Sequence, residues 1–244
     1  MREILILAEL EGGVLHSSAG ELLAAGRKLG DEMGMDVSAA VLGESTDDAA
    51  GDAIMLGADH VYTASHPILT EGLADGQIAA LQQICAETSP LAVLTAKTPL
   101  GRSVGPRLAY RLDSGVAQDC MDVTGDNTTG RITVTRPVYG GNAMAKFTFA
   151  DNDPQVVVLR VKAFEPLEPN PERSGDVRSI DVSIDDSQIK SKLVETVKEE
   201  SEGVKLEDAG VIIGGGRGLG GPEPFEQLEE LAKLFNGAVG ASRA

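Results

Sequence analysis

Short apolar segments alternate with segments of helical period through the first 112 residues, and this alternation constrains the fold most strongly. Residues 4–7 form a continuous apolar run, as a parallel strand buried on both faces requires. Residues 18–33 follow with apolar side chains at helical spacing. The alternation predicts an α/β fold with a mostly parallel sheet and helices on both faces. The other predicted strands are residues 37–42, 61–64 and 91–95, and the other predicted helices are residues 46–56, 71–87 and 101–112.

The pattern changes after residue 130. Residues 131–136 alternate between apolar and polar side chains, and residues 143–150 and 155–161 follow at short spacing. Turn residues separate these segments, with Gly140 and Gly141 in the first turn and Asn152 to Pro154 in the second. We expect an antiparallel or mixed β addition that closes a first domain of residues 1–164.

Residues 165–208 differ in composition from what precedes them. They hold 13 acidic and 6 basic residues, a net charge of −7, and open with Pro166, Pro169 and Pro171. Such a composition is typical of a semi-rigid, solvated connector. We predict an acidic linker with one helix at about residues 186–200.

Residues 209–244 predict the start of a second, Rossmann-like domain. An apolar strand at 211–213 leads through a glycine-rich loop to a helix at 225–235, and a further strand begins at 238. Gly216, Gly218 and Gly221 satisfy the pattern G-x-G-x-x-G, in which backbone amides and a helix N-terminus bind a pyrophosphate. A tight turn that requires positive φ angles is the alternative reason for the glycines.

Two arginines lie where such a domain binds ligands. Arg217 is inside the glycine-rich loop, and Ser242 and Arg243 follow the next strand. Open α/β sheets bind ligands at the carboxyl ends of their strands, and a guanidinium pairs well with phosphate. We therefore expect Arg217 and Arg243 to converge on one crevice.

The chain is strongly acidic, with 38 Asp and Glu against 21 Lys and Arg and a net charge of −17. An acidic surface repels phosphate backbones and anionic lipid, so nucleic acid is an unfavourable partner. No apolar stretch reaches the length of a membrane span, so we expect no membrane insertion. Cys85 and Cys120 are far apart and form no CxxC pair, which predicts reduced thiols and a cytoplasmic location.

Catalytic arrangements are not evident in the sequence. His16, His60 and His66 are the only histidines, and none has metal-ligand spacing with another histidine or cysteine. We therefore predict no metal site and no catalytic residue. A nicotinamide-dependent dehydrogenase is disfavoured, because the acid that binds the ribose about 20 residues after the glycines is missing.

Several motifs resemble the alpha subunits of electron-transfer flavoproteins. Gly215 to Leu219 followed by a helix and then by Gly240 to Ala244 is similar to the start of their FAD-binding domain. Residues 135–145, Thr-Arg-Pro-Val-Tyr-Gly-Gly-Asn-Ala-Met-Ala, resemble the β segment of that family. Residues 7–13 and 100–108 resemble its opening strand and the helix after its fifth strand, so the resemblance covers essentially the whole chain.

The resemblance implies an electron carrier that works as a heterodimer with a beta subunit and holds FAD between the two subunits. It implies that Gly216, Arg217 and Gly218 contact the phosphates or the surroundings of the flavin, and that Ser242 and Arg243 lie at the flavin ring. A cation there favours the reduced flavin, so the protein tunes a cofactor that supplies the chemistry itself. The first domain would dock the beta subunit, and acyl-CoA or other flavin dehydrogenases would donate the electrons.

Members of this family continue well beyond the Ser-Arg motif, whereas the sequence stops at Ala244. We therefore expect the FAD-binding domain to be incomplete here and FAD not to be held tightly by this chain alone. Two alternatives stay open, namely a flavin-free docking or scaffold domain derived from this family and a component of an electron-bifurcating flavoprotein.

Overall fold

Seven parallel strands build the central sheet of the first part of the chain. The computed structural model describes residues 2–69, 73–150, 152–195, 206 and 209–241. The strand order is β12-β5-β4-β1-β6-β11-β7, and every neighbouring pair is parallel. The strands are β1 (Glu3–Ala8), β4 (Asp36–Gly43), β5 (His60–Ser65), β6 (Ala92–Ala96), β7 (Val116–Cys120), β11 (Gln155–Leu159) and β12 (Asp176–Ser179).

Four helices cover the two faces of this sheet, as the alternation predicts. In β1, Ile4 and Ile6 pack with α1 (Ser17–Met33) and α2 (Asp47–Met55), whereas Leu5 and Leu7 pack with α3 (Ala74–Thr88) and α4 (Pro99–Arg111). Successive side chains of a strand point to opposite faces, so a continuous apolar run builds two cores. Each fully buried leucine or isoleucine contributes about 1.5–3 kcal/mol to folding.

Local signals set the limits of the helices. The His16 Nδ1 accepts a hydrogen bond from Ser18 N at the start of α1, and Gly34 ends that helix in the left-handed region at φ 64. Thr98 caps α4 by accepting from Gly101 N at 2.9 Å. Thr46 occupies the cap position of α2, but its side chain makes no capping hydrogen bond.

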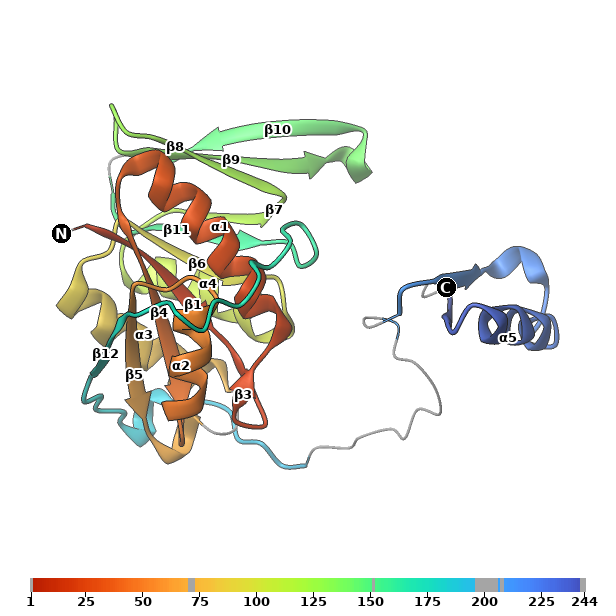
Figure 1. The fold of residues 1–244 in the computed structure, drawn as a ribbon, viewed down its shortest axis with the longest axis horizontal. Helices are drawn as coiled ribbons and strands as arrows, with labels where there is room; N and C mark the ends of the chain where they lie inside the picture. The colour runs from red at the N-terminus through yellow and green to blue at the C-terminus, as the bar shows by residue number, and fades with distance from the viewer. Residues whose placement is uncertain (1, 70–72, 151, 196–205, 207–208, 242–244) are drawn as a thin grey trace. The chain divides into compact units, whose positions relative to one another are not determined.

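The β addition is antiparallel, but one of its three strands differs from the prediction. β8 (Asp122–Asp126), β9 (Arg131–Val138) and β10 (Ala143–Thr148) form a separate sheet of order β10-β9-β8, which extends beside β7 in Figure 1. β11 does not belong to it, because its residues insert between β6 and β7 as a parallel strand buried on both faces. A short hairpin of β2 (Leu10–Glu11) and β3 (Val14–Leu15) follows β1.

The predicted acidic linker contributes to the first sheet. β12 extends that sheet by pairing with β5, and its four residues are exposed. The helix predicted at residues 186–200 is wrong for the part that the structure describes: a 3-10 turn covers Asp186–Gln188, and residues 189–195 are not helical. Lys190 N donates to Asp75 Oδ2 at 2.7 Å instead of to a carbonyl of a preceding helical turn, so a tertiary contact holds this segment outside a helix. Residues 196–200 lie outside the described residues.

The contacts divide the chain into two compact units, Met1–Leu193 and Val194–Ala244. In the second unit, β13 (Ile212–Gly215) leads through a 3-10 turn to α5 (Phe225–Leu234) and β14 (Ala238–Ala241). β13 and β14 are parallel, and the hydrogen bond from Ala238 N to Val211 O at 2.9 Å closes their pairing. This is the strand–helix–strand unit that the sequence predicts.

Candidate functional site

The glycine-rich loop leaves the carboxyl end of β13 as an open turn. Gly216 is extended, at φ −149 and ψ −175, and Arg217–Leu219 form one turn of 3-10 helix. Leu219 N donates to Gly216 O at 3.0 Å, and Gly220 closes the turn at φ 80. Only Gly220 in this loop requires the left-handed region, so the turn alone does not account for the other glycines.

Glycines of this unit have two different surroundings. A Cβ at Gly215 would lie 2.6 Å from Phe225 Cε1, and one at Gly237 would lie 2.5 Å from Val211 O, so both glycines permit close packing of α5 or of the strands. A Cβ at Gly216 or Gly218 would meet no atom within 4 Å. The backbone at Gly216 and Gly218 is therefore open to a ligand, as the approach of a pyrophosphate requires.

The register of β13 and β14 places the start of the glycine-rich loop and the end of β14 at the same edge of this two-stranded sheet. Gly215 pairs with Ala241, so the loop that contains Arg217 and the chain that follows Ala241 leave the sheet at the same end. Arg217 is exposed. Ser242 and Arg243 lie outside the described residues, so their predicted convergence with Arg217 stays a prediction.

The first turn of α5 has few backbone amides that are free to bind an anion. Phe225 N donates to Pro222 O at 2.9 Å, and Glu226 N donates to Glu223 O at 3.2 Å. Pro222 and Pro224 carry no amide hydrogen. The amides of the loop, rather than those of the helix, are therefore the better candidates for anion binding.

An ionic cluster that sequence reasoning missed lies at the carboxyl edge of the first sheet. Arg160 binds Asp119 through two hydrogen bonds of 2.8 Å, and Lys97 Nζ lies 2.8 Å from Asp119 Oδ1. The hydrogen bonds from Arg160, followed by Lys97, hold the pKa of Asp119 well below its usual range. A β-bulge places Asp119 here at φ 64. The sequence signal that could have found this cluster is position: Lys97 and Arg160 directly follow strands, and Asp119 lies at the end of one.

Glu9 fills the point where the strand order of the first sheet reverses. β1 lies between β4 and β6, and this is the place where open α/β sheets usually bind ligands. Glu9 is buried there, and Thr98 Oγ1 donates to its carboxylate at 2.7 Å. Burial raises the pKa of Glu9 against the opposing effect of that hydrogen bond. The carboxylate of Glu9 thus lies at the position where such sheets usually bind ligands.

Arg107 and His60 also have structural partners. Arg107 pairs with Asp75, so neither Arg107 nor Lys97 is a free anion site. His60 lies 3.6 Å from both Asp36 and Asp176. Among the described residues, no group of three or more His, Cys, Asp or Glu side chains gathers as a metal site. None of the helices in the described ranges is long and apolar enough to cross a membrane.

Comparison with known proteins decides the family. Residues 4–185 match the electron transfer flavoprotein domain, and residues 205–244 match the electron transfer flavoprotein FAD-binding domain. The chain is 37% identical over 243 residues to electron transfer flavoprotein subunit alpha of Thermoanaerobacterium thermosaccharolyticum. The aligned region covers 100% of this chain and 73% of that relative. The chain belongs to the electron transfer flavoprotein alpha-subunit family.

Other members of the electron transfer flavoprotein family give the same result. The alpha subunit of Megasphaera elsdenii is 37% identical over 243 residues, with 99% of this chain and 72% of the relative covered. The protein FixB of Azotobacter vinelandii is 31% identical over 248 residues, with 100% of this chain and 69% of the relative covered. The open glycine loop thus lies in the part of the chain that matches the FAD-binding domain of electron transfer flavoproteins.

Proposed function

We propose that this chain is the alpha subunit of an electron transfer flavoprotein and that it carries electrons on FAD as a heterodimer with a beta subunit. The observation that supports this most directly is the parallel strand–helix–strand unit whose loop backbone is open at Gly216 and Gly218. It lies within the residues that match the FAD-binding domain. Electrons would pass from flavin dehydrogenases to an acceptor.

In this proposal each residue of the loop has a defined task. Gly216 and Gly218 let backbone amides approach the pyrophosphate, and Arg217, which is exposed, supplies a cation for the phosphates. Ser242 and Arg243 bind near the flavin ring. FAD, when bound, supplies the redox chemistry, and the protein contributes orientation and charge.

The predicted domains take separate tasks in the same proposal. Residues 1–164 bind the beta subunit, residues 165–208 contribute β12 to the first sheet and lead to the second unit, and residues 209–244 begin the FAD-binding domain. The buried carboxylate of Glu9 lies where the strand order of the first sheet reverses and would repel the phosphates of a cofactor at that point.

A matched pair of glycine variants tests the loop. We expect Gly216→Ala to leave the thermal stability unchanged, because the new methyl group meets no atom and φ −149 suits alanine. The methyl group would obstruct the phosphates, so the Kd for FAD should rise by about tenfold or more, or about 1.4 kcal/mol. Gly214→Ala is the control, because its Cβ is equally free. Equal FAD affinity of the two variants, measured by fluorescence titration of the complex, would contradict the assignment.

A further inference from the structure

A segment of 24 residues carries no acidic side chain. Residues 127–150, which we call the acid-free ribbon, contain β9 and β10 together with Arg131, Arg136 and Lys146. With 38 acids in 244 residues, a segment of this length would hold about four acids on average (38 × 24/244). The ribbon is therefore a basic feature on a chain of net charge −17, and its surface favours a partner that bears carboxylates.

Large apolar side chains on the ribbon are exposed. Tyr139 is 84% exposed, Met144 is 54% exposed and Phe147 is 46% exposed. Tyr139 also has φ 53, and a bulky residue in the left-handed region is uncommon and costs free energy. Aromatic residues and methionine are enriched where proteins meet, so the surface has the composition of an interface.

A groove separates the ribbon from the edge of the main sheet. It has a volume of about 290 Å³, and its lining includes Val116 and Ala117 of β7 and Arg136, Phe147 and Phe149 of the ribbon. β7 and β10 are the edge strands of their sheets among the described residues. Edge strands present unpaired backbone groups to which an extended segment of another protein can add.

Arg136 offers a hydrogen-bond donor for a carboxylate in this groove. Its Nε is buried and makes no hydrogen bond to any group of the described residues. A buried donor without a partner is unfavourable, and a carboxylate would satisfy it with a charge-assisted hydrogen bond. Lys146 likewise forms no ion pair with the described part of the chain.

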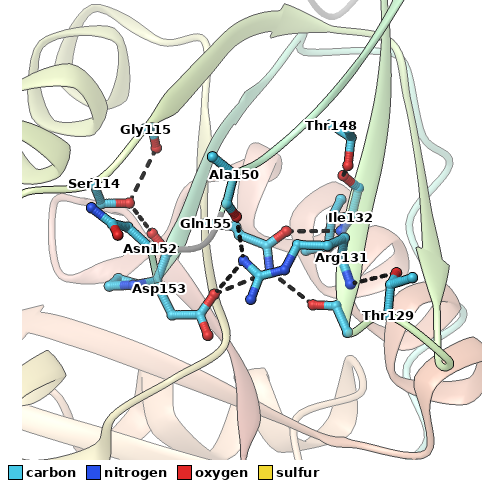
Figure 2. Close-up of polar contacts among 12 residues, drawn as sticks. Ser114, Gly115, Thr129, Arg131, Ile132, Thr148, Ala150, Asn152, Asp153 and Gln155 are labelled. Carbon is cyan, nitrogen blue, oxygen red and sulfur yellow. Dashed lines mark hydrogen bonds and ion pairs between the residues drawn. The ribbon is translucent and has the colours of Figure 1, made fainter.

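The base of the ribbon is held firmly, so the surface is preformed. Figure 2 shows the buried side chain of Gln155 between Ile132 and Asp153. Gln155 Oε1 accepts from Ile132 N at 2.8 Å, and its Nε2 donates to Gly130 O at 3.1 Å. Arg131 donates to Asp153 at 2.9 Å and to Ala150 O at 2.7 Å. These contacts fix where β9 begins and where β10 ends, which lowers the entropy cost of binding.

We propose that the acid-free ribbon and its groove bind an extended, carboxylate-bearing segment of the beta subunit. A carboxylate of that segment would accept a hydrogen bond from Arg136. The proposal rests on the proposed function, because it takes the beta subunit as its occupant. A second copy of this chain fits less well, because two-fold pairing of ribbons would bring Arg136 and Lys146 near their own copies.

The α4 surface provides a matched control. Residues 88–112 also lack acids, and Tyr110 on α4 is 87% exposed, but Lys97 and Arg107 of that segment already pair with Asp119 and Asp75. The test compares two double variants. The ribbon variant carries Tyr139→Asp and Lys146→Glu, and the α4 variant carries Tyr110→Asp and Arg102→Glu. Each double variant removes one exposed tyrosine and reverses one charge, and aspartate tolerates the left-handed backbone at position 139.

Binding to the beta subunit of the same genome is measured by titration calorimetry, after melting curves show that both variants are folded. The ribbon variant should raise the Kd about a hundredfold, and the α4 variant should change it by less than about threefold. In the wild-type complex, amides of β7 and β10 should exchange hydrogen more slowly than in the free chain.

The other outcomes separate the two proposals. A wild-type chain that does not bind the beta subunit would contradict the proposed function itself. Binding that is equally strong in the ribbon and α4 variants would overturn the ribbon proposal and leave the function standing. A chain that dimerises alone, and loses the dimer through the ribbon substitutions, would place a second copy on the ribbon and overturn the proposal as well.

Discussion

Asp119 shows how one side chain can join three strands. It binds Arg160 and Lys97 from a bulge at the carboxyl edge of the sheet, and these contacts hold its pKa well below the usual value. A carboxylate with a lowered pKa stabilises the fold above its unfolded pKa of about 3.9, and this contribution is lost as the pH falls toward the folded pKa.

We therefore expect Asp119→Asn to be less stable than the wild type at pH 7, with a difference that shrinks below about pH 4. Asparagine also adopts the left-handed backbone at φ 64, so the variant changes the charge and keeps the bulge. Urea unfolding of both proteins at pH 7, 5 and 3 measures the difference. A stability difference that did not change with pH would show that the ion pairs contribute nothing.

Arg243 is the residue whose proposed task concerns the flavin itself. If its guanidinium lies at the ring, Arg243→Ala should lower the flavin reduction potential, because a cation favours the reduced flavin. A loss of about 1.5 kcal/mol corresponds to about 30 mV for a two-electron couple. Spectroelectrochemical titration of the complex measures this, with Lys233→Ala on the exposed face of α5 as a control. An unchanged potential would remove Arg243 from the ring.

Sequence patterns identified most elements of the fold but not all of their partners. Residues 155–161 were expected in the antiparallel addition, yet β11 is a parallel strand inside the main sheet, between β6 and β7. The five residues Gln155–Leu159 are buried on both faces, and the run of valines at 156–158 carries that signal. Which strands become neighbours depends on contacts that are distant in sequence, and β12 and the cluster around Asp119 were missed for this reason.

Local patterns were sufficient in the second unit. The glycines, prolines and apolar runs of residues 209–241 predicted β13, α5 and β14 within about two residues, because this unit depends on contacts close in sequence. The surroundings of each glycine could not be predicted, since they depend on how closely α5 and the strands pack.

Gly237 tests this close packing at the scale of the element. A Cβ there would lie 2.5 Å from Val211 O, so Gly237→Ala must displace the start of β14 from β13. We expect a loss of about 1–3 kcal/mol, seen as faster hydrogen exchange in α5 and β14. Gly214→Ala, whose Cβ meets no atom within 4 Å, should exchange as the wild type does. Equal exchange in both variants would show that the turn at Gly237 has room to adjust.

At the scale of the whole molecule, the contacts form two units that match two families. The first unit ends at Leu193, and Lys190 N is tied to it by a hydrogen bond of 2.7 Å to Asp75. The matched families cover residues 4–185 and 205–244. The predicted limits at residues 164 and 208 stay predictions. This division fits a carrier whose first unit docks a partner and whose second unit begins a cofactor site.

The visible absorption spectrum of the protein, purified from its own cells with the subunits that accompany it, tests the central proposal most directly. We predict flavin bands that correspond to one FAD per complex of this chain with a beta subunit. The bands should disappear on addition of a reduced dehydrogenase partner as electrons reach the flavin. A stable complex with the beta subunit that is colourless would contradict the proposal, because this chain would then dock its partner without carrying electrons.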